Sequence, residues 1–293
     1  MHRSGFVNIL GNPNVGKSTL MNALVGERLS IITSKAQTTR HRIRGIVNGD
    51  DFQIVYSDTP GILRPAYKLQ ESMLKFVNTA FIDADIILYV TDVIEKFNKN
   101  IDYIDRLQQM KIPVLVLINK IDLSSEAEVT ELVTGWHALL PKAEILPVSA
   151  LQNFNLSLLF DRILALLPEG PAYYPKDALT DRPERFFVSE IIREKVFTNY
   201  RKEIPYSVEV VIESFIEEKK LTRISAVIYV MRDSQKGIVI GQRGMALKKV
   251  GTEARKEIED FLERKVFLQL FVKVKKDWRD ESGMLRNFGY ETS

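Results

Sequence analysis

Cysteine is absent from the 293-residue sequence, and this absence removes several kinds of chemistry. Disulfide frameworks, thiolate zinc sites and cysteine nucleophiles all need a sulfur atom that the chain does not supply. No apolar run approaches the roughly 18 residues that a membrane-spanning helix needs. The N-terminal residues also lack the long apolar stretch of a signal peptide. We therefore expect a soluble protein of a reducing compartment, most simply the cytoplasm.

A large excess of either charge is also missing, since 41 Lys and Arg stand against 38 Asp and Glu. This balance excludes a polyanionic tail protein and a histone-like chain. The first 180 residues carry 18 basic and 19 acidic side chains, whereas the remainder carries 23 and 19. The length predicts two domains, and the second half is the more basic one.

The first half alternates short apolar runs with longer amphipathic ones, which is typical of βα units in a mostly parallel sheet. We therefore predict an α/β doubly wound domain over residues 1–168. Strands are expected at residues 6–10, 52–57, 86–91, 114–119 and 143–148. Helices are expected at residues 17–26, 68–82, 101–110, 126–140 and 156–167.

Four prolines interrupt any regular pattern after residue 167, so residues 169–184 are predicted to be an extended linker. A smaller α+β domain is expected over residues 185–293. Its elements are a helix at 186–200, strands at 207–217 and 221–231, a short apolar turn at 236–240, a helix at 245–263 and a strand at 266–274. The apolar face of the long helix predicts these core residues: Leu247, Val250, Ala254, Ile258 and Phe261.

A glycine-bounded loop follows the first predicted strand and opens the first predicted helix. Gly11 and Gly16 let the backbone curl so that successive N–H groups point at phosphate oxygens, and the helix N-terminus adds its dipole. Lys17 supplies a cation to the β and γ phosphates, and Ser18 offers a hydroxyl to Mg²⁺. The spacing therefore predicts a nucleotide-binding loop made of Gly11, Asn12, Pro13, Asn14, Val15, Gly16, Lys17, Ser18 and Thr19.

A second motif follows the strand predicted at 52–57. Asp58 at a strand end can hold Mg²⁺ through water, and Gly61 offers a backbone N–H that can approach a γ-phosphate closely. By itself such a tetrapeptide is an ordinary turn. After a phosphate loop it predicts a γ-phosphate sensor formed by Asp58, Thr59, Pro60 and Gly61.

The strand predicted at 114–119 ends in a motif that selects the base. Asp122 can accept hydrogen bonds from N1–H and the exocyclic amine of guanine, whereas adenine has an acceptor at that edge. Lys120 can lie over the base, and Asn119 can tie this loop to the phosphate loop. Ser149 and Ala150 can present a backbone N–H to the guanine oxygen, although these small residues also suit a plain strand end.

Residues 34–44 contain the threonine that a GTPase needs for Mg²⁺ and the γ-phosphate. Thr38 and Thr39 are the candidates, and Thr39 is preferred because it stands directly before an arginine. Two interpretations remain open for the basic residues of this segment, which are RNA contact and a solvated loop. These residues are Arg40, His41, Arg42 and Arg44.

Ile62 stands where Ras-like enzymes carry a glutamine that orients the attacking water. An alkyl side chain cannot do this, so slow intrinsic hydrolysis is expected. Asn14 in the phosphate loop can ligate K⁺ beside the phosphates, or it can simply suit the turn. The residues expected to act in catalysis are Lys17, Thr39, Gly61 and Asn14.

In the second half, Gly241 and Gly244 bound a loop that precedes the long helix. A G-x-x-G tetrapeptide alone is weak evidence, but the surrounding order of helices and strands is that of a type II KH domain, whose loop clamps single-stranded RNA. Gln242 and Arg243 are then expected near the nucleotides. Basic residues suited to phosphate contact, or to a solvated face, are Lys236, Lys248, Lys249, Lys273, Lys275, Lys276 and Arg279.

Taken in order, the motifs of the first half are GNPNVGKS, KAQTTRHR, DTPG and NKID, and those of the second half include FFVSEIIREK, PYSVEV, VIGQRG and VKVKKDW. Across nearly its whole length the chain resembles the Era family of bacterial GTPases, and it departs from the family pattern at residues 62–65. The resemblance implies a monomeric GTPase that binds GTP or GDP with Mg²⁺. It also implies binding to the 3′ end of 16S rRNA and a role in maturation of the 30S subunit.

Two alternatives differ from this expectation. One is a cell-cycle signalling GTPase in peripheral contact with the inner membrane, although acidic side chains on the helix predicted at 245–263 would repel anionic lipid. The other is an RNA-binding module that is gated by GTP and turns it over negligibly, which Ile62 makes credible. A metabolic kinase is nearly excluded because the base motif favours guanine.

Overall fold

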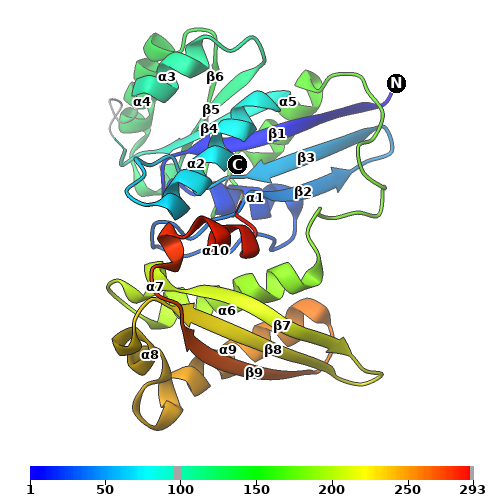
Figure 1. The fold of residues 1–293 in the computed structure, drawn as a ribbon. Coiled ribbons are helices and arrows are strands. Elements are labelled where there is room, and N and C mark those ends of the chain that lie inside the picture. The colour runs from blue at the N-terminus through cyan, green and yellow to red at the C-terminus, as the bar shows by residue number, and fades with distance from the viewer. Residues whose placement is uncertain (96–100, 291–293) are drawn as a thin grey trace. The chain divides into compact units, whose positions relative to one another are not determined.

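The computed structural model describes residues 1–95 and 101–290 (Figure 1). The chain divides into two compact units. The N-terminal unit contains Met1–Ser30, Thr39–Arg64 and Met73–Asp181. The C-terminal unit contains the residues from Arg182 onward together with two short segments, Ile31–Thr38 and Pro65–Ser72. Among the described residues, none of the helices combines the length and the apolar character needed to cross a membrane.

The N-terminal unit is built on a six-stranded sheet in the order β2-β3-β1-β4-β5-β6 (Figure 1). Neighbouring strands run parallel except β2, which is antiparallel to β3. The strands are β1 (Arg3–Gly11), β2 (Ile43–Asn48), β3 (Phe52–Asp58), β4 (Ile86–Asp92), β5 (Val114–Asn119) and β6 (Glu144–Pro147). The α/β doubly wound sheet expected from the sequence is therefore confirmed.

The five helices predicted for this half are present and end within two residues of their predicted bounds. They are α1 (Lys17–Val25), α2 (Lys68–Ile82), α3 (Ile101–Gln108), α4 (Glu126–Leu139) and α5 (Leu156–Leu166). Apolar side chains of α2, α3 and α4 form one core with the sheet, which includes Phe81, Tyr89, Val116 and Trp136. This packing explains why β4 and β5 read as continuous apolar runs, because both of their faces are covered.

Strand β2 was not predicted, because its first two residues belong to the basic segment 34–44 and no element was predicted for the other four. It is short, and an arginine and a glycine interrupt its apolar pattern. Gly45 is required there, because a Cβ atom at this position would lie 2.7 Å from side-chain carbons of both Met21 and Val25 on α1. Strand β2 therefore lies directly against the helix that follows the phosphate loop.

The residues predicted as a linker lie along the edge of the N-terminal unit up to Asp181. The amide of Ser4 donates to the carbonyl of Pro168 at 3.1 Å, and isolated bridges join Arg3 to Glu169 and Gly45 to Thr180. The next helix, α6, begins at Glu184.

The C-terminal unit contains a three-stranded sheet in the order β7-β8-β9, with β7 antiparallel and β9 parallel to β8. Helices α6 and α9 form its core with the inner face of that sheet. The elements are α6 (Glu184–Asn199), α7 (Ile204–Ser207), β7 (Glu209–Glu217), β8 (Thr222–Val230), α8 (Asp233–Ile240), α9 (Met245–Leu262), β9 (Val266–Val274) and α10 (Ser282–Asn287). The described residues also include three single-turn helices, η1 (Ile121–Leu123) in the N-terminal unit and η2 (Gln242–Gly244) and η3 (Trp278–Asp280) in the C-terminal unit.

Two predictions for this half were wrong in detail, and the short helices α7 and α10 were not predicted. The segment expected as a short turn is the end of helix α8. In α9 the buried residue of the last turn is Leu262, whereas Phe261 is 36% exposed. The apolar stripe of a helix with 3.6 residues per turn drifts around the axis, and near the end of α9 it has moved by one position.

Candidate nucleotide and nucleic-acid sites

The loop that joins β1 to α1 has the backbone expected of a phosphate-binding loop. Gly11, Asn14 and Gly16 all have positive φ angles, of 146°, 66° and 98°. Lys17 is buried beneath the loop, and its Nζ donates to the carbonyls of Gly11 at 3.0 Å and Asn12 at 2.7 Å. Burial lowers the pKa of Lys17 to about 8, and the nearby carboxylates of Asp58 and Glu95 oppose that shift.

Asn119, at the end of β5, ties the phosphate loop to the neighbouring strands. Its Nδ2 donates to the carbonyl of Val15 at 2.8 Å, and its Oδ1 accepts from the amide of Ala150 at 3.0 Å. A Cβ atom on Gly16 would lie 2.2 Å from Nδ2 of Asn119. The loop is therefore enclosed on this side, with room for glycine but not for a larger residue.

Ser18, Thr39 and Asp58 converge at the end of β3. Ser18 Oγ donates to Asp58 Oδ2 at 2.7 Å and lies 2.8 Å from Thr39 Oγ1. Thr38, the other candidate, instead donates from Oγ1 to the carbonyl of Lys35 at 2.7 Å. The structure thus brings Thr39 next to Ser18 and Asp58, the other two residues of the predicted metal set.

This cluster fits a magnesium ion. Asp58 is fully buried, and its Oδ1 has no hydrogen-bond partner. Burial raises the pKa of Asp58, while Lys17 and hydroxyl donors oppose the rise. The described residues contain no cluster of three or more His, Asp or Glu side chains arranged around a metal position. A single carboxylate with two hydroxyls suits an ion whose remaining ligands are phosphate and water oxygens.

The loop after Asp58 lies against the phosphate loop. A Cβ atom on Gly61 would lie 2.7 Å from the backbone of Pro13, and the amide of Ile62 donates to the carbonyl of Gly11 at 3.1 Å. The side chain of Ile62 is 2% exposed and belongs to the apolar core. Ile62 is thus a core residue as well as one that cannot orient water.

The predicted base-selecting residues also come together. Ser149 Oγ donates to Asp122 Oδ1 at 2.5 Å. Lys120 has a positive φ of 62°, and its Nζ donates to the carbonyl of Asn14 and to Asp92 Oδ2, both at 2.6 Å. These contacts lie at the carboxyl ends of parallel strands, where doubly wound sheets bind ligands.

The basic residues near Thr39 do not form a solvated loop. Arg40, His41 and Arg42 are 0%, 6% and 5% exposed, so that interpretation is wrong for all three, and their burial also removes them from RNA contact in this conformation. Arg44 is partly exposed and donates to Asp181 at 3.0 Å. Both interpretations assumed that these charged residues are exposed, whereas the fold supplies partners such as Asp83 for Arg42 and Asp181 for Arg44.

In the C-terminal unit, the predicted RNA loop is formed by the end of α8, η2 and the start of α9. Gly241 and Gly244 have φ angles of 71° and 75°, and the side chains of Gln242 and Arg243 are exposed. A Cβ atom on Gly241 would lie 2.6 Å from Cβ of Ala246, whereas one on Gly244 would meet nothing within 4 Å. The loop is therefore open at Gly244.

The lysines around this loop differ in their surroundings. Lys248 and Lys249 are exposed on the first turns of α9, and Lys249 lies 3.8 Å from Glu253. Lys236 and Lys275 are half-buried. Lys273 donates to Glu213 at 2.6 Å, and this hydrogen bond raises its pKa. Lys273 is therefore held by a carboxylate of β7, whereas Lys248 is exposed at the start of α9.

A groove between α9 and β9 was not predicted from the sequence. It is a cavity of about 360 Å³ lined by Gly244, Leu247, Lys248, Gly251, Thr252, Arg255, Leu268 and Leu270. A Cβ atom on Gly251 would lie 3.4 Å from Leu270 Cδ1, so the glycine widens this groove. A glycine inside a helix costs about 1 kcal/mol, and that cost was the signal that could have indicated the groove.

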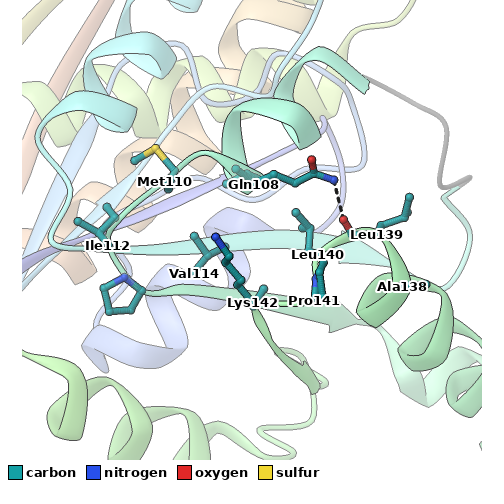
Figure 2. Close-up of a pocket in the computed structure, with 12 residues that line it drawn as sticks. Gln108, Met110, Ile112, Val114, Ala138, Leu139, Leu140, Pro141 and Lys142 are labelled. Atoms are coloured by element: carbon teal, nitrogen blue, oxygen red, sulfur yellow. Dashed lines mark hydrogen bonds between the residues drawn. The ribbon is translucent and has the colours of Figure 1, made fainter.

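A second cavity, of about 380 Å³, lies in the N-terminal unit near the start of β5 and the end of α4 (Figure 2). Gln108 Nε2 donates to the carbonyl of Leu139 at 2.8 Å beside it. Its lining residues lie within 107–114 and 138–143 and include none of the predicted site residues. The nucleotide-binding motifs follow the carboxyl ends of the strands, whereas this cavity lies at the amino end of β5, so it is separate from the nucleotide site.

Two family models match the chain. The model described as 50S ribosome-binding GTPase matches residues 6–120, and the model described as KH domain matches residues 203–279. Two curated relatives, from Geotalea daltonii and Geotalea uraniireducens, are both named GTPase Era. Each is 47% identical, over 290 and 291 residues, which cover 98% and 99% of this chain and 98% of each relative.

Two solved Era structures match both units. A variant of Era from Aquifex aeolicus bound to GDP·AlF4⁻ is 40% identical, with a TM-score of 0.95 over 99% of this chain and all of that one. Era in complex with MgGDPNP and nucleotides 1506–1542 of 16S ribosomal RNA is 39% identical, with a TM-score of 0.95 over the full length of both chains. Since both halves and their order match throughout, the chain belongs to the Era family of GTPases.

Proposed function

We propose that this protein binds and hydrolyses GTP with Mg²⁺, binds the 3′ end of 16S rRNA and acts in the maturation of the 30S subunit. The observation that carries the nucleotide part is the convergence of Ser18, Thr39 and Asp58 above the buried Lys17. The solved relatives that hold MgGDPNP with 16S rRNA nucleotides, and GDP·AlF4⁻, support the choice of ligands.

For the reaction itself, Lys17 is proposed to hold the β and γ phosphates, and the backbone N–H groups of residues 11–18 other than Pro13 would surround them. Ser18 and Thr39 would hold Mg²⁺, with Asp58 acting through water. When bound, the ion neutralises charge that develops on the phosphate oxygens. Gly61 would donate its N–H to the γ-phosphate, since its backbone lies directly against Pro13.

Guanine selection is proposed to depend on the carboxylate of Asp122. Ser149 holds this carboxylate in place, and Asn119 holds the amide of Ala150 beside it. An acceptor-only group fits the donors of guanine and leaves adenine without a match. Lys120 is fixed by Asn14 and Asp92, so its stem can cover one face of the base.

Thr59 and Pro60 form the turn between Asp58 and Gly61, and Thr59 Oγ1 donates to the carbonyl of Ile9 at 2.7 Å.

RNA binding is proposed to combine the exposed loop 241–244 with the groove between α9 and β9. Gln242 and Arg243 would contact the nucleotide backbone, while Leu247 and Leu270 offer apolar surface to the bases. Phosphate contacts are proposed for Lys236, Lys248, Lys249 and Lys275.

The proposed function is tested by measuring GTP turnover and RNA affinity on the same preparation. We expect Mg²⁺-dependent release of phosphate from GTP but not from ATP. We also expect binding of an oligonucleotide with the 3′-terminal sequence of 16S rRNA, and at least tenfold weaker binding of a scrambled oligonucleotide. Absence of Mg²⁺-dependent GTP turnover would refute the enzymatic part, and equal affinity for both oligonucleotides would refute the rRNA part.

We further propose that K⁺ supports hydrolysis through Asn14. Asn14 lies in the phosphate loop with its side chain exposed and its carbonyl held by Lys120. A cation there would supply the charge that an arginine provides in other GTPases. Turnover at matched ionic strength is expected to be faster in K⁺ than in Na⁺, and Asn14→Ala should remove the difference. Equal rates in both salts would contradict the proposal, and a K⁺ effect that survives Asn14→Ala would place the cation elsewhere.

A monomer in the cytoplasm is proposed as the acting form, with peripheral contact at the inner membrane as the alternative. Helix α9 carries Glu253, Glu257, Glu259 and Asp260 beside its basic residues, and these acidic groups oppose binding to anionic lipid. Vesicles of anionic phospholipid should therefore float without the protein. Co-flotation at physiological salt would favour the membrane alternative.

A further inference from the structure

A partly buried ion pair lies at the base of the segment that carries Thr39. The guanidinium of Arg42 donates from Nη1 to Asp83 Oδ2 at 2.6 Å and from Nη2 to Asp83 Oδ1 at 2.9 Å. The side chain of Arg42 is 5% exposed and that of Asp83 is 35% exposed. Two parallel hydrogen bonds between planar groups fix both the distance and the angle between their backbones.

The same guanidinium also reaches two strands of the sheet. Its Nε donates to Ser57 Oγ at 2.5 Å, and Nη2 also donates to Asn8 Oδ1 at 3.0 Å. Asn8 in turn donates from Nδ2 to Asp83 Oδ1 at 2.8 Å and to the carbonyl of Ala80 at 2.7 Å. Arg42 therefore joins β1, β3 and the end of α2 through one satisfied polar network inside the N-terminal unit.

Residues of this hydrogen-bond network are close in sequence to Thr39 and Asp58, two of the residues proposed to hold magnesium. Arg42 follows Thr39 by three residues, and Ser57 directly precedes Asp58. Asp83 follows the last residue of α2, which begins after the loop containing Gly61. The ion pair thus connects the chain segments on both sides of the residues proposed to surround the γ-phosphate.

We propose that Arg42 and Asp83 are a positioning pair for GTP hydrolysis. The pair fixes the start of β2, so that Thr39 returns to the same place beside Ser18 and Asp58 in each turnover. Neither residue of the pair contacts the reacting atoms. The proposal rests on the metal-binding role given to Thr39 under the proposed function. It predicts that loss of the pair lowers the rate of GTP hydrolysis more than it lowers the affinity for GDP, because Thr39 is needed only for Mg²⁺ and the γ-phosphate.

Asp85 provides a matched control two residues away. Its Oδ2 accepts from the amide of Phe6 at 2.8 Å, so it ties the same turn to β1 without touching the segment that carries Thr39. Asp83→Asn and Asp85→Asn remove the same charge from the same turn. A merely structural role for the turn would make the two substitutions similar, whereas a positioning role makes them different.

The experiment compares kcat, KM for GTP and the affinity for GDP in the wild type, Asp83→Asn and Asp85→Asn. For Asp83→Asn we expect kcat to fall about tenfold or more, with GDP affinity within about twofold of the wild type. Asp85→Asn should leave kcat within about twofold. Circular dichroism and thermal unfolding establish that each variant is folded.

Arg42→Lys is the second variant, and it keeps the charge while losing the planar fork. It should lower kcat in the same direction as Asp83→Asn and leave GDP affinity unchanged, and it carries the test if Asp83→Asn does not fold. The proposal is overturned by wild-type kcat in folded Asp83→Asn, by equal losses in Asp83→Asn and Asp85→Asn, or by a matching loss of GDP affinity. Absence of turnover in the wild type itself would instead refute the proposed function.

Discussion

The phosphate loop in the N-terminal unit and the loop 241–244 in the C-terminal unit solve a similar problem in different ways. Each leads into the N-terminus of a helix through a glycine in the left-handed conformation, Gly16 before α1 and Gly244 before α9. Both therefore present backbone N–H groups and the positive end of a helix dipole. They differ in enclosure, since an added Cβ meets Asn119 at 2.2 Å at Gly16 but nothing within 4 Å at Gly244.

The difference extends to the lysines. Lys17 is buried, where electrostatic attraction to a phosphate is strong, whereas Lys248 and Lys249 are exposed and their attraction is screened by salt. An enclosed loop can surround one small ligand with many fixed contacts. An open loop can accept a polymer whose chain must enter and leave on both sides. The two loops thus share a backbone device, and their surroundings decide which ligand each one fits.

The largest expected effect follows from removing the buried cation. Lys17→Ala should weaken binding of GTP and GDP by about a thousandfold, because it removes a desolvated charge from the phosphates. Fluorescent nucleotide titration measures this loss, with Lys111→Ala as a control on an exposed lysine. RNA affinity without nucleotide should be unchanged in Lys17→Ala. A modest loss of nucleotide affinity would show that the loop depends less on Lys17 than its burial indicates.

In the open loop, the substitution expected to have a comparable effect is the replacement of both Gly241 and Gly244 by Asp. The side chains would hold the backbone away from the RNA, and two carboxylates would face its phosphates. RNA affinity should therefore fall by about several hundredfold, the combined cost of two added repulsive contacts. GTP affinity should be retained. Gly237→Asp is the matched control, because Gly237 is an exposed glycine on α8 with nothing within 4 Å of an added Cβ. Equal RNA affinity in the folded double variant would remove this loop from the RNA site.

The enclosed site should also be selective for its base. Asp122→Asn places an amide donor against guanine N1–H, so GTP affinity should fall about a hundredfold while xanthosine triphosphate gains affinity. Competition titration with both nucleotides measures the ratio of the affinity for GTP to the affinity for xanthosine triphosphate. The same ratio of affinities in wild type and variant would show that Asp122 does not read the base.

What could be predicted from the sequence was local, and what was missed depends on contacts between distant residues. The strands of the N-terminal sheet were recognisable because burial on both faces makes them continuously apolar, and the motifs were recognisable because their spacing is set by one loop. The burial of Arg42 was not recognisable, since its partner Asp83 lies 41 positions away. Strand β2 was not predicted for the same reason, because its arginine, Arg44, is neutralised by Asp181, which lies 137 positions away.

The C-terminal site shows the same limit. The loop 241–244 could be identified from its glycines and neighbouring elements, but the groove between α9 and β9 could not. Its walls come from two elements that meet only in the folded chain, and Leu268 and Leu270 read simply as strand residues. Gly251 was a local signal of that groove, because a glycine inside a long helix needs a reason from packing.

The smallest expected effect is a dependence on pH that separates the two loops. Burial lowers the pKa of Lys17 from 10.5 to about 8 in the free protein. Because the unfolded chain keeps this proton up to the higher pKa, the stability of the free protein should rise between about pH 8 and 10 as the cost of burying the charge is relieved. Bound phosphates favour the charged form, so nucleotide binding in that range must take up a proton.

Nucleotide affinity should therefore fall as pH rises above about 8, by about tenfold between pH 7 and 9. Thermal unfolding and nucleotide titration across this range should show opposite slopes, and calorimetry in buffers of different ionisation enthalpy should show proton uptake above pH 8. Lys17→Ala should lose the rise in stability. An affinity for GTP that stays constant from pH 7 to 9 would mean that Lys17 keeps its proton in the free protein, because Asp58 and Glu95 then outweigh its burial.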